Sequence, residues 1–164
     1  MKIQDLLPSL KSQSILESFL QVKVEIKKED LLETLTVLKQ GGFRVLMDLT
    51  AVDFIEPKKV THVLYFLHNP ESLEKIRIAV HAERGESLPT ATKLFAGADW
   101  YEREVFDMFG VPFTDHPDLK RILMPDDWKG HPMRKDYSLT EESVEFKHDV
   151  KPKVPSTIIP YVKD

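Results

Sequence analysis

The chain has 164 residues, 41% of them hydrophobic and 30% charged, a composition typical of one soluble globular domain. Its formal net charge of −4 argues against a nucleic-acid-binding protein, which would require a basic face. The absence of cysteine excludes thiolate catalysis, disulfides and cysteine-ligated iron–sulfur clusters. No apolar run approaches the roughly 20 residues of a membrane-spanning helix, so we expect any membrane association to occur through partners.

The N-terminal third predicts helix, strand and helix in that order. Apolar residues within 2–20 favour two short helices broken near Pro8. Apolar and charged residues alternate over 22–26, which predicts a half-buried strand. A helix capped by Asp30 should follow and end at the glycines 41–42.

Three more strands are predicted at residues 43–54, 60–68 and 76–82, of which the first two are apolar on both faces. A further helix is expected from near Pro89 to near Gly97. This order predicts an α+β fold, in which a strand–helix–strand crossover and an antiparallel meander form a mixed four-stranded sheet with helices mainly on one face.

Residues 99–109 predict an amphipathic helix that begins at the cap residue Asp99 and stops at Gly110. Aromatic and aliphatic residues occupy one face. The opposite face should carry a charged strip of four residues: Glu102, Arg103, Glu104 and Asp107. Helix-surface carboxylates beside an arginine are more often ion pairs than an acid–base pair, so we favour ion pairs here.

Prolines and apolar anchors alternate with charges of both signs after the helix, which favours an extended arm laid across a surface. The chain is therefore divided into an α+β domain, residues 1–110, and a proline-rich arm, residues 111–164. The surface under the arm could be its own domain or another protein, and we expect the arm to dock on partner subunits. Aromatic residues and arginines are typical of interfaces. The interface candidates are Glu102, Arg103, Glu104, Asp107, His116, Lys120, Arg121, Trp128, His131, Arg134, Lys135 and Asp136.

Other kinds of site are less well supported by the pattern. The histidines are not spaced for chelation, and neither a nucleophile with an adjacent base nor a glycine-rich phosphate loop is present. The cations at 120–121 and 134–135 could form a lipid-headgroup patch, but interleaved acids offset their charge. We therefore expect no catalytic, cofactor-binding or metal-binding residue in this chain.

Three motifs carry a resemblance to a known family. The pattern of acids, His116, Lys120 and apolar residues over 102–123 is similar to the signature of the 30-kDa subunit of respiratory complex I, the C subunit of bacterial NADH:quinone oxidoreductase. Residues 130–137 (GHPMRKDY) and 48–54 (DLTAVDF) resemble two further hallmarks of that family. The resemblance covers about residues 22–149, with Asp99 where the family commonly has asparagine.

The resemblance implies a structural subunit of the peripheral arm of a proton-translocating NADH:quinone oxidoreductase, on the cytoplasmic side of a bacterial inner membrane. It implies contact with the 49-kDa subunit and with neighbouring subunits of the quinone-binding module, and it places FMN, iron–sulfur clusters and quinone in partner subunits. The alternatives are the equivalent subunit of a membrane-bound hydrogenase or of a dehydrogenase with another donor. A weaker alternative is a free-standing enzyme that uses the carboxylates at 102–107.

Overall fold

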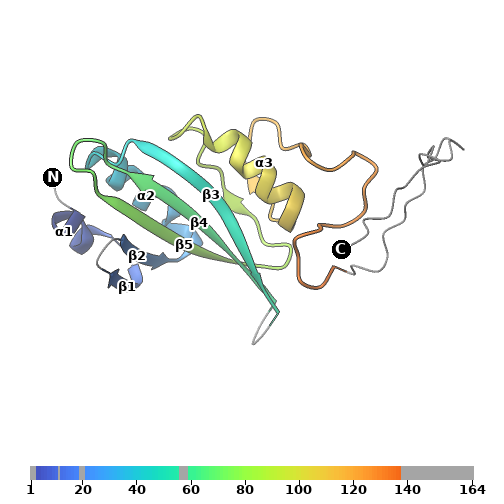
Figure 1. Ribbon diagram of the computed structural model, residues 1–164, viewed down its shortest axis with the longest axis horizontal. Coiled ribbons are helices and arrows are strands. Elements are labelled where there is room, and N and C mark those ends of the chain that lie inside the picture. The colour runs from blue at the N-terminus through green and yellow to red at the C-terminus, as the bar shows by residue number, and fades with distance from the viewer. Residues whose placement is uncertain (1–2, 11, 19–20, 56–58, 138–164) are drawn as a thin grey trace, which may run out of the picture.

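A mixed sheet of five strands lies at the centre of the computed structural model, which describes residues 3–10, 12–18, 21–55 and 59–137 (Figure 1). Strand β2 is parallel to β5, and the other neighbouring pairs are antiparallel. From one edge to the other the strands are β1 (Ser12–Ser18), β2 (Gln21–Ile26), β5 (Lys75–Glu83), β4 (Val60–His68) and β3 (Val45–Phe54).

The α+β class and the four predicted strands, β2 to β5, are confirmed. Two short helices are predicted before these strands, and the prediction of the second helix is wrong. A short helix α1 (Ile3–Leu6) continues into the 3-10 turn η1 (Leu7–Ser9), but β1 then pairs with β2 as a fifth strand. Pairing with an open sheet edge overrides the weak helical spacing of this segment.

Two helices, α2 (Leu31–Gln40) and α3 (Ala98–Phe109), share the core with one face of the sheet. Figure 1 draws α2 behind the sheet and α3 beside β3. In β4 the residues at 61, 63, 65 and 67 are buried, whereas their alternating neighbours are half-buried, so only one face of this strand meets the core. Three leucines of α2, at 31, 35 and 38, are fully buried and contribute about 1.5–3 kcal/mol each.

The helix limits differ from the predicted ones in two places. Helix α3 begins at Ala98 after Gly97, and Asp99 makes no capping hydrogen bond. No helix forms over 89–97, because β6 (Leu88–Pro89) pairs in parallel with β7 (Phe113–Thr114) and the intervening loop turns toward α3. The predicted stop at Gly110 is confirmed, since this residue has the left-handed φ of 73°.

Residues 110–137, called the arm segment below, follow α3 and lie on the domain itself. Its orange trace extends from the end of α3 and returns beside the far end of the sheet (Figure 1). Val111 and Phe113 are buried in the core, and Leu119 and Met124 pack against it. The rest of the predicted arm, residues 138–164, lies outside the described residues. In the part of the chain that the structure describes, no helix is long and apolar enough to cross a membrane.

Candidate functional site: three buried carboxylates

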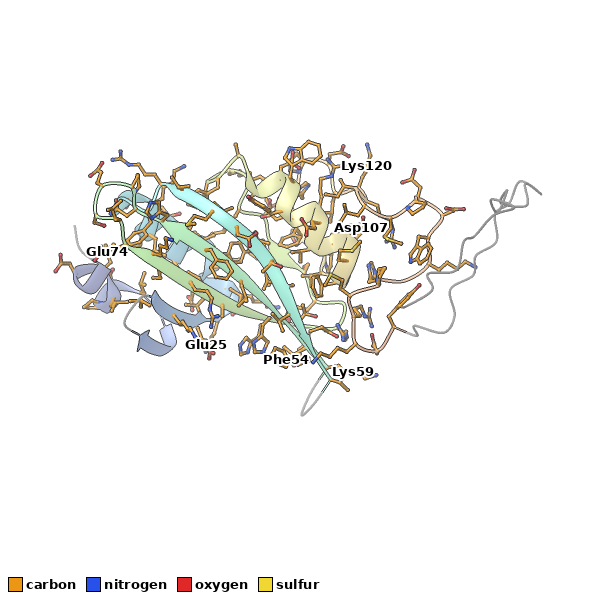
Figure 2. All side chains as sticks on the ribbon, viewed as in Figure 1. Glu25, Phe54, Lys59, Glu74, Asp107 and Lys120 are labelled. Carbon is orange, nitrogen blue, oxygen red and sulfur yellow. The ribbon has the colours of Figure 1, made fainter. Side chains whose placement is uncertain are left out.

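Asp107 fixes the middle of the arm segment to helix α3. Its carboxylate is 0% exposed and accepts the backbone N–H groups of Ile122, Leu123 and Met124 at 3.0, 2.7 and 2.9 Å. The Arg121 guanidinium donates to the other carboxylate oxygen at 2.7 Å. Burial alone would raise the pKa of Asp107, but these donors outweigh it and lower the pKa below its usual value. Figure 2 shows Asp107 on α3, on the side of the arm segment.

The end of α3 holds the next part of the arm segment through its backbone. The Asp107 carbonyl meets Nδ1 of His131 at 2.9 Å, and the Met133 N–H donates to the Met108 carbonyl at 3.0 Å. His131 packs so closely on Gly110 that a Cβ there would overlap its ring. Glycine is therefore required at 110 both for its φ and for this contact.

Asp53 lies near the end of β3, on the face of the strand that meets the core, and fixes the end of the arm segment. It accepts the Thr61 hydroxyl at 2.9 Å, the Arg84 guanidinium at 2.6 Å and the Lys135 backbone N–H at 2.9 Å. Asp136 lies 3.8 Å from the same guanidinium. The pKa of Asp53 is lowered: burial acts to raise it, but the donors, led by Arg84, outweigh burial.

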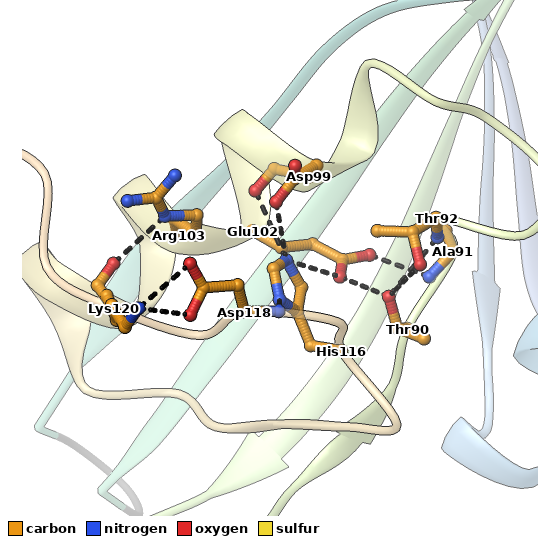
Figure 3. Close-up of polar contacts among 9 residues, drawn as sticks. All are labelled: Thr90, Ala91, Thr92, Asp99, Glu102, Arg103, His116, Asp118 and Lys120. Carbon is orange, nitrogen blue, oxygen red and sulfur yellow. Dashed lines mark hydrogen bonds and ion pairs between the residues drawn. The ribbon is translucent and has the colours of Figure 1, made fainter.

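Glu102 occupies the buried face of α3 (Figure 3). Its Oε1 accepts the Ala91 backbone N–H at 2.7 Å, and its Oε2 accepts the Thr90 hydroxyl at 2.6 Å. Nε2 of His116 lies 3.8 Å from Oε2 and 3.2 Å from a carboxylate oxygen of Asp99. Burial raises the pKa of Glu102 to about 7, with Asp99 adding to the rise and the two hydrogen bonds opposing it.

Around these anchors, large apolar side chains point to solvent from α3 and the arm segment. Trp100, Leu123 and Met133 are 61%, 60% and 56% exposed. The Arg103 guanidinium stacks 4.9 Å from the Trp100 ring and donates to the Lys120 carbonyl at 3.1 Å. Tryptophan and arginine are among the residues most often found at energetically dominant positions of protein interfaces.

The predicted charged strip does not form one surface. Glu102 and Asp107 are 0% exposed and bind backbone amides of this chain, so the expectation that they contact a partner directly is corrected. The His116 side chain is also buried, against Asp99 and Glu102.

The other interface candidates fall into two groups. Five of them bond within the arm segment or to the domain, through side chain or backbone: Arg121, His131, Arg134, Lys135 and Asp136. Of the remaining four, Glu104 and Lys120 are exposed and Arg103 and Trp128 are half-buried. Arg103 and Lys120 also bond within the chain. Of the predicted strip, only Arg103 and Glu104 are therefore accessible to a partner.

Three functional positions, Asp53, Arg84 and Thr90, are absent from the sequence-based candidates. The spacing of Asp53 is informative, because Leu49, Ala51 and Asp53 follow each other with period 2 on one face of β3. An acid at the third position of an inward-facing row requires a buried partner. Arg84 and Thr90 have no comparable signal, since both lie in loops.

Two further features of the described residues concern metal binding and a surface cavity. Within the described ranges no group of three or more potential ligands could hold a metal ion. A cavity of about 320 Å³ lies over β3, β4 and β5. Its lining residues are Met47, Asp48, Phe66, Leu67, Lys75 and Ile76, which do not combine a nucleophile with an adjacent base.

Comparison with known proteins gives consistent matches. The family model described as respiratory-chain NADH dehydrogenase, 30 Kd subunit, matches residues 24–143. The C subunit of NADH-quinone oxidoreductase from Citrifermentans bemidjiense is 46% identical over 121 residues, which cover 73% of this chain and 75% of the relative. The C/D subunit of NADH-quinone oxidoreductase from Bdellovibrio bacteriovorus is 39% identical over 120 residues, or 73% of this chain and 21% of that longer protein.

A solved structure extends the match to three dimensions. The trypsin-resistant fragment (1-134) of Nqo5 superposes with a TM-score of 0.65 at 28% sequence identity. The alignment covers 73% of this chain and all of the fragment.

Proposed function

This chain belongs to the family of the 30-kDa subunit of respiratory-chain NADH dehydrogenase, and from that premise we propose that it is a non-catalytic structural subunit of a bacterial NADH:quinone oxidoreductase. It acts in the peripheral arm on the cytoplasmic side of the inner membrane and supports the quinone-binding module. FMN, iron–sulfur clusters and quinone belong to its partner subunits.

The use of the three buried carboxylates carries the non-catalytic part of this proposal. The carboxylate oxygens of Asp107 and Asp53 accept hydrogen bonds from amide, hydroxyl and guanidinium groups of the chain itself. Glu102 is enclosed by Thr90 and Ala91. An acid that takes part in a reaction must reach substrate, whereas these acids position a segment of backbone.

The partner that we propose is the 49-kDa subunit of the same complex, which is the D subunit of the bacterial enzyme. The C/D subunit of Bdellovibrio bacteriovorus contains the region matched here as 21% of its length. Its name joins the C and D subunits in one protein, which supports a close association of the two. A rigidly held arm segment lowers the ordering cost of association. The exposed Trp100 ring, with the Arg103 guanidinium stacked on it, supplies a preformed contact of the kind that dominates interface energies.

We predict that the purified chain shows no flavin or iron–sulfur absorbance and does not turn over NADH or quinone. The physical reason is the lack of cysteine and of a glycine-rich dinucleotide loop in the sequence. Visible absorption spectra with flavin and iron analysis test this directly. A stoichiometric flavin or iron signal from pure protein contradicts the proposal.

A second prediction concerns association with the 49-kDa subunit. Trp100→Ala should weaken binding by about 30-fold or more, because truncating a tryptophan at an energetically dominant position of an interface costs at least about 2 kcal/mol. Arg103→Ala should act in the same direction, since it removes the guanidinium stacked on the ring. The dissociation constants are measured with the purified 49-kDa subunit.

Matched controls exist for both variants. Leu73, 75% exposed in the turn before β5, is the control for Trp100, and the exposed Lys75 is the control for Arg103. Leu73→Ala and Lys75→Ala should leave the dissociation constant nearly unchanged. If they weaken binding as much as the α3 variants, the contact lies elsewhere and the proposed interface is wrong.

A further inference from the structure

Glu102 differs from the other two buried carboxylates in its charge environment. Asp107 and Asp53 each pair with a guanidinium, at 2.7 and 2.6 Å. Among the described residues, neither lysine nor arginine forms an ion pair with Glu102, and the ionisable groups that act on it include His116, Asp99 and Tyr65. A buried carboxyl without a cation binds a proton more readily than an exposed one.

The threonine hydroxyls beside Glu102 suit both of its protonation states. The Thr90 hydroxyl lies 2.6 Å from Oε2 of Glu102 and 2.9 Å from the Thr92 hydroxyl, and Thr92 is only half-buried (Figure 3). When Glu102 is ionised, Thr92 donates to Thr90 and Thr90 donates to the carboxylate. When Oε2 carries a proton, Glu102 donates to Thr90 and Thr90 donates to Thr92. Both directions of donation use the same heavy-atom positions.

His116 joins this carboxyl to the arm segment. Its Nδ1 accepts the Asp118 backbone N–H at 3.1 Å, which places the ring hydrogen of the neutral imidazole on Nε2. Nε2 hydrogen-bonds the Asp99 carbonyl oxygen at 3.3 Å, and it lies 3.2 Å from a carboxylate oxygen of Asp99 and 3.8 Å from Oε2 of Glu102. A negative charge on Glu102 therefore attracts the ring N–H, and proton uptake removes this attraction.

We propose that Glu102 is a reversible proton-binding site, which exchanges its proton through the Thr90 and Thr92 hydroxyls and reports its charge to the arm segment through His116. The groups that face it are Asp99 on α3, Thr90 in the preceding loop, His116 in the arm segment and the buried Tyr65 on β4. Burial raises the pKa of Tyr65 well above its usual value, and the nearby Glu102 raises it further. The Glu102 pKa of about 7 agrees with this geometry.

Loss of the Glu102 proton lowers the stability of the fold but strengthens the attraction between Glu102 and His116. The pKa of Glu102 is about 7 in the fold against an ordinary value of 4.5, so the folded chain binds the proton more tightly than the unfolded chain. The stability that this proton supplies is present below pH 4.5 and is lost as the pH rises through about 7. The attraction between Glu102 and His116, in contrast, is gained over the upper part of that range.

The test is an NMR titration of the full 164-residue chain between about pH 5 and about pH 9. The Ala91 amide proton, which bonds Oε1 directly, and the Glu102 side-chain carbonyl carbon should shift with one common midpoint near 7. The Asp118 amide should follow the same midpoint, because it bonds the ring that Glu102 attracts. Thr90→Val should move the midpoint to higher pH, since it removes a hydrogen bond that favours the ionised form.

Two substitutions complete the experiment. Glu102→Gln keeps the shape of the side chain and should abolish the titration of the Ala91 amide. Glu104→Gln, at an exposed position of the same helix, should leave the midpoint unchanged. The proposal is overturned if the wild-type midpoint lies below about pH 5.5, if Ala91 does not titrate, or if the titration persists without Glu102. The wild-type midpoint decides the question even if a variant fails to fold.

Discussion

Asp107→Asn is expected to lower the free energy of unfolding by about 3–5 kcal/mol, the usual cost of breaking a buried charge pair by removing one partner. An asparagine has one acceptor oxygen where the aspartate has two. Whichever way its amide is turned, its NH₂ group faces either the Arg121 guanidinium or the row of backbone N–H groups at 122–124. Denaturant unfolding measures the loss, and hydrogen exchange of the 122–124 amides shows whether the arm segment is released.

The control for this variant is Asp118→Asn. Asp118 is exposed and pairs with the exposed Lys120, so its replacement should change stability by less than about 0.5 kcal/mol. If both variants lose the same stability, the carboxylate of Asp107 does not hold the arm segment in the way described. Faster exchange confined to residues 120–124 in the Asp107 variant would support the assignment of the effect to these bonds.

Asp53→Asn is expected to have an effect of similar size, about 3–5 kcal/mol, because it leaves Arg84 without its main counter-charge in a mostly buried position. The variant should also lose acid sensitivity. The pKa of Asp53 is lowered in the fold, so its contribution is present above the unfolded pKa and is lost as the pH falls through the folded one. Unfolding free energies of wild type and variant, measured from neutral to acidic pH, should therefore converge on acidification.

Asp48→Asn is the matched control on the same strand. Asp48 faces away from the core and is exposed, so its loss should leave both the stability at neutral pH and the acid dependence nearly unchanged. A gap between wild type and the Asp53 variant that stays constant down to low pH would show that lost packing, and not lost charge, causes the destabilisation. Exchange of the Lys135 amide, which bonds Asp53 directly, reports whether the end of the arm segment detaches.

The sheet is largely predictable from the sequence because its strands have strong local patterns. Strands β2 to β5 combine apolar periodicity with clear turn signals, and the structure places all four where they are expected. Strand β1 lacks such a pattern and forms by pairing with the edge of β2. The loop at 89–97 was not predictable from Pro89 alone, because the pairing of β6 with β7 depends on residues more than twenty positions away.

Burial of the acids is only partly visible in the sequence. Glu102 lies in line with Ala98, Val105 and Phe109, which are spaced to face the core, so a helical projection places it among buried residues. The positions of its partners cannot be read from that projection, since Thr90 belongs to a preceding loop and His116 to the arm segment. The motifs of the family mark the right residues. The sequence analysis predicts a solvated strip on α3, whereas the structure encloses two of its carboxylates, Glu102 and Asp107.

The separation between Asp53 and its last donor also bears on synthesis of the chain. Lys135 is 82 residues further along than Asp53, and the amides that bond Asp107 lie 15–17 residues beyond it. During translation each acid therefore emerges well before the groups that satisfy it. Until those groups are available, burial of either carboxylate would remove its hydration without replacing the lost hydrogen bonds. Dehydration of each carboxylate becomes favourable only once its donors have left the ribosome, so these acids tie the closing of the domain to the arrival of the arm segment.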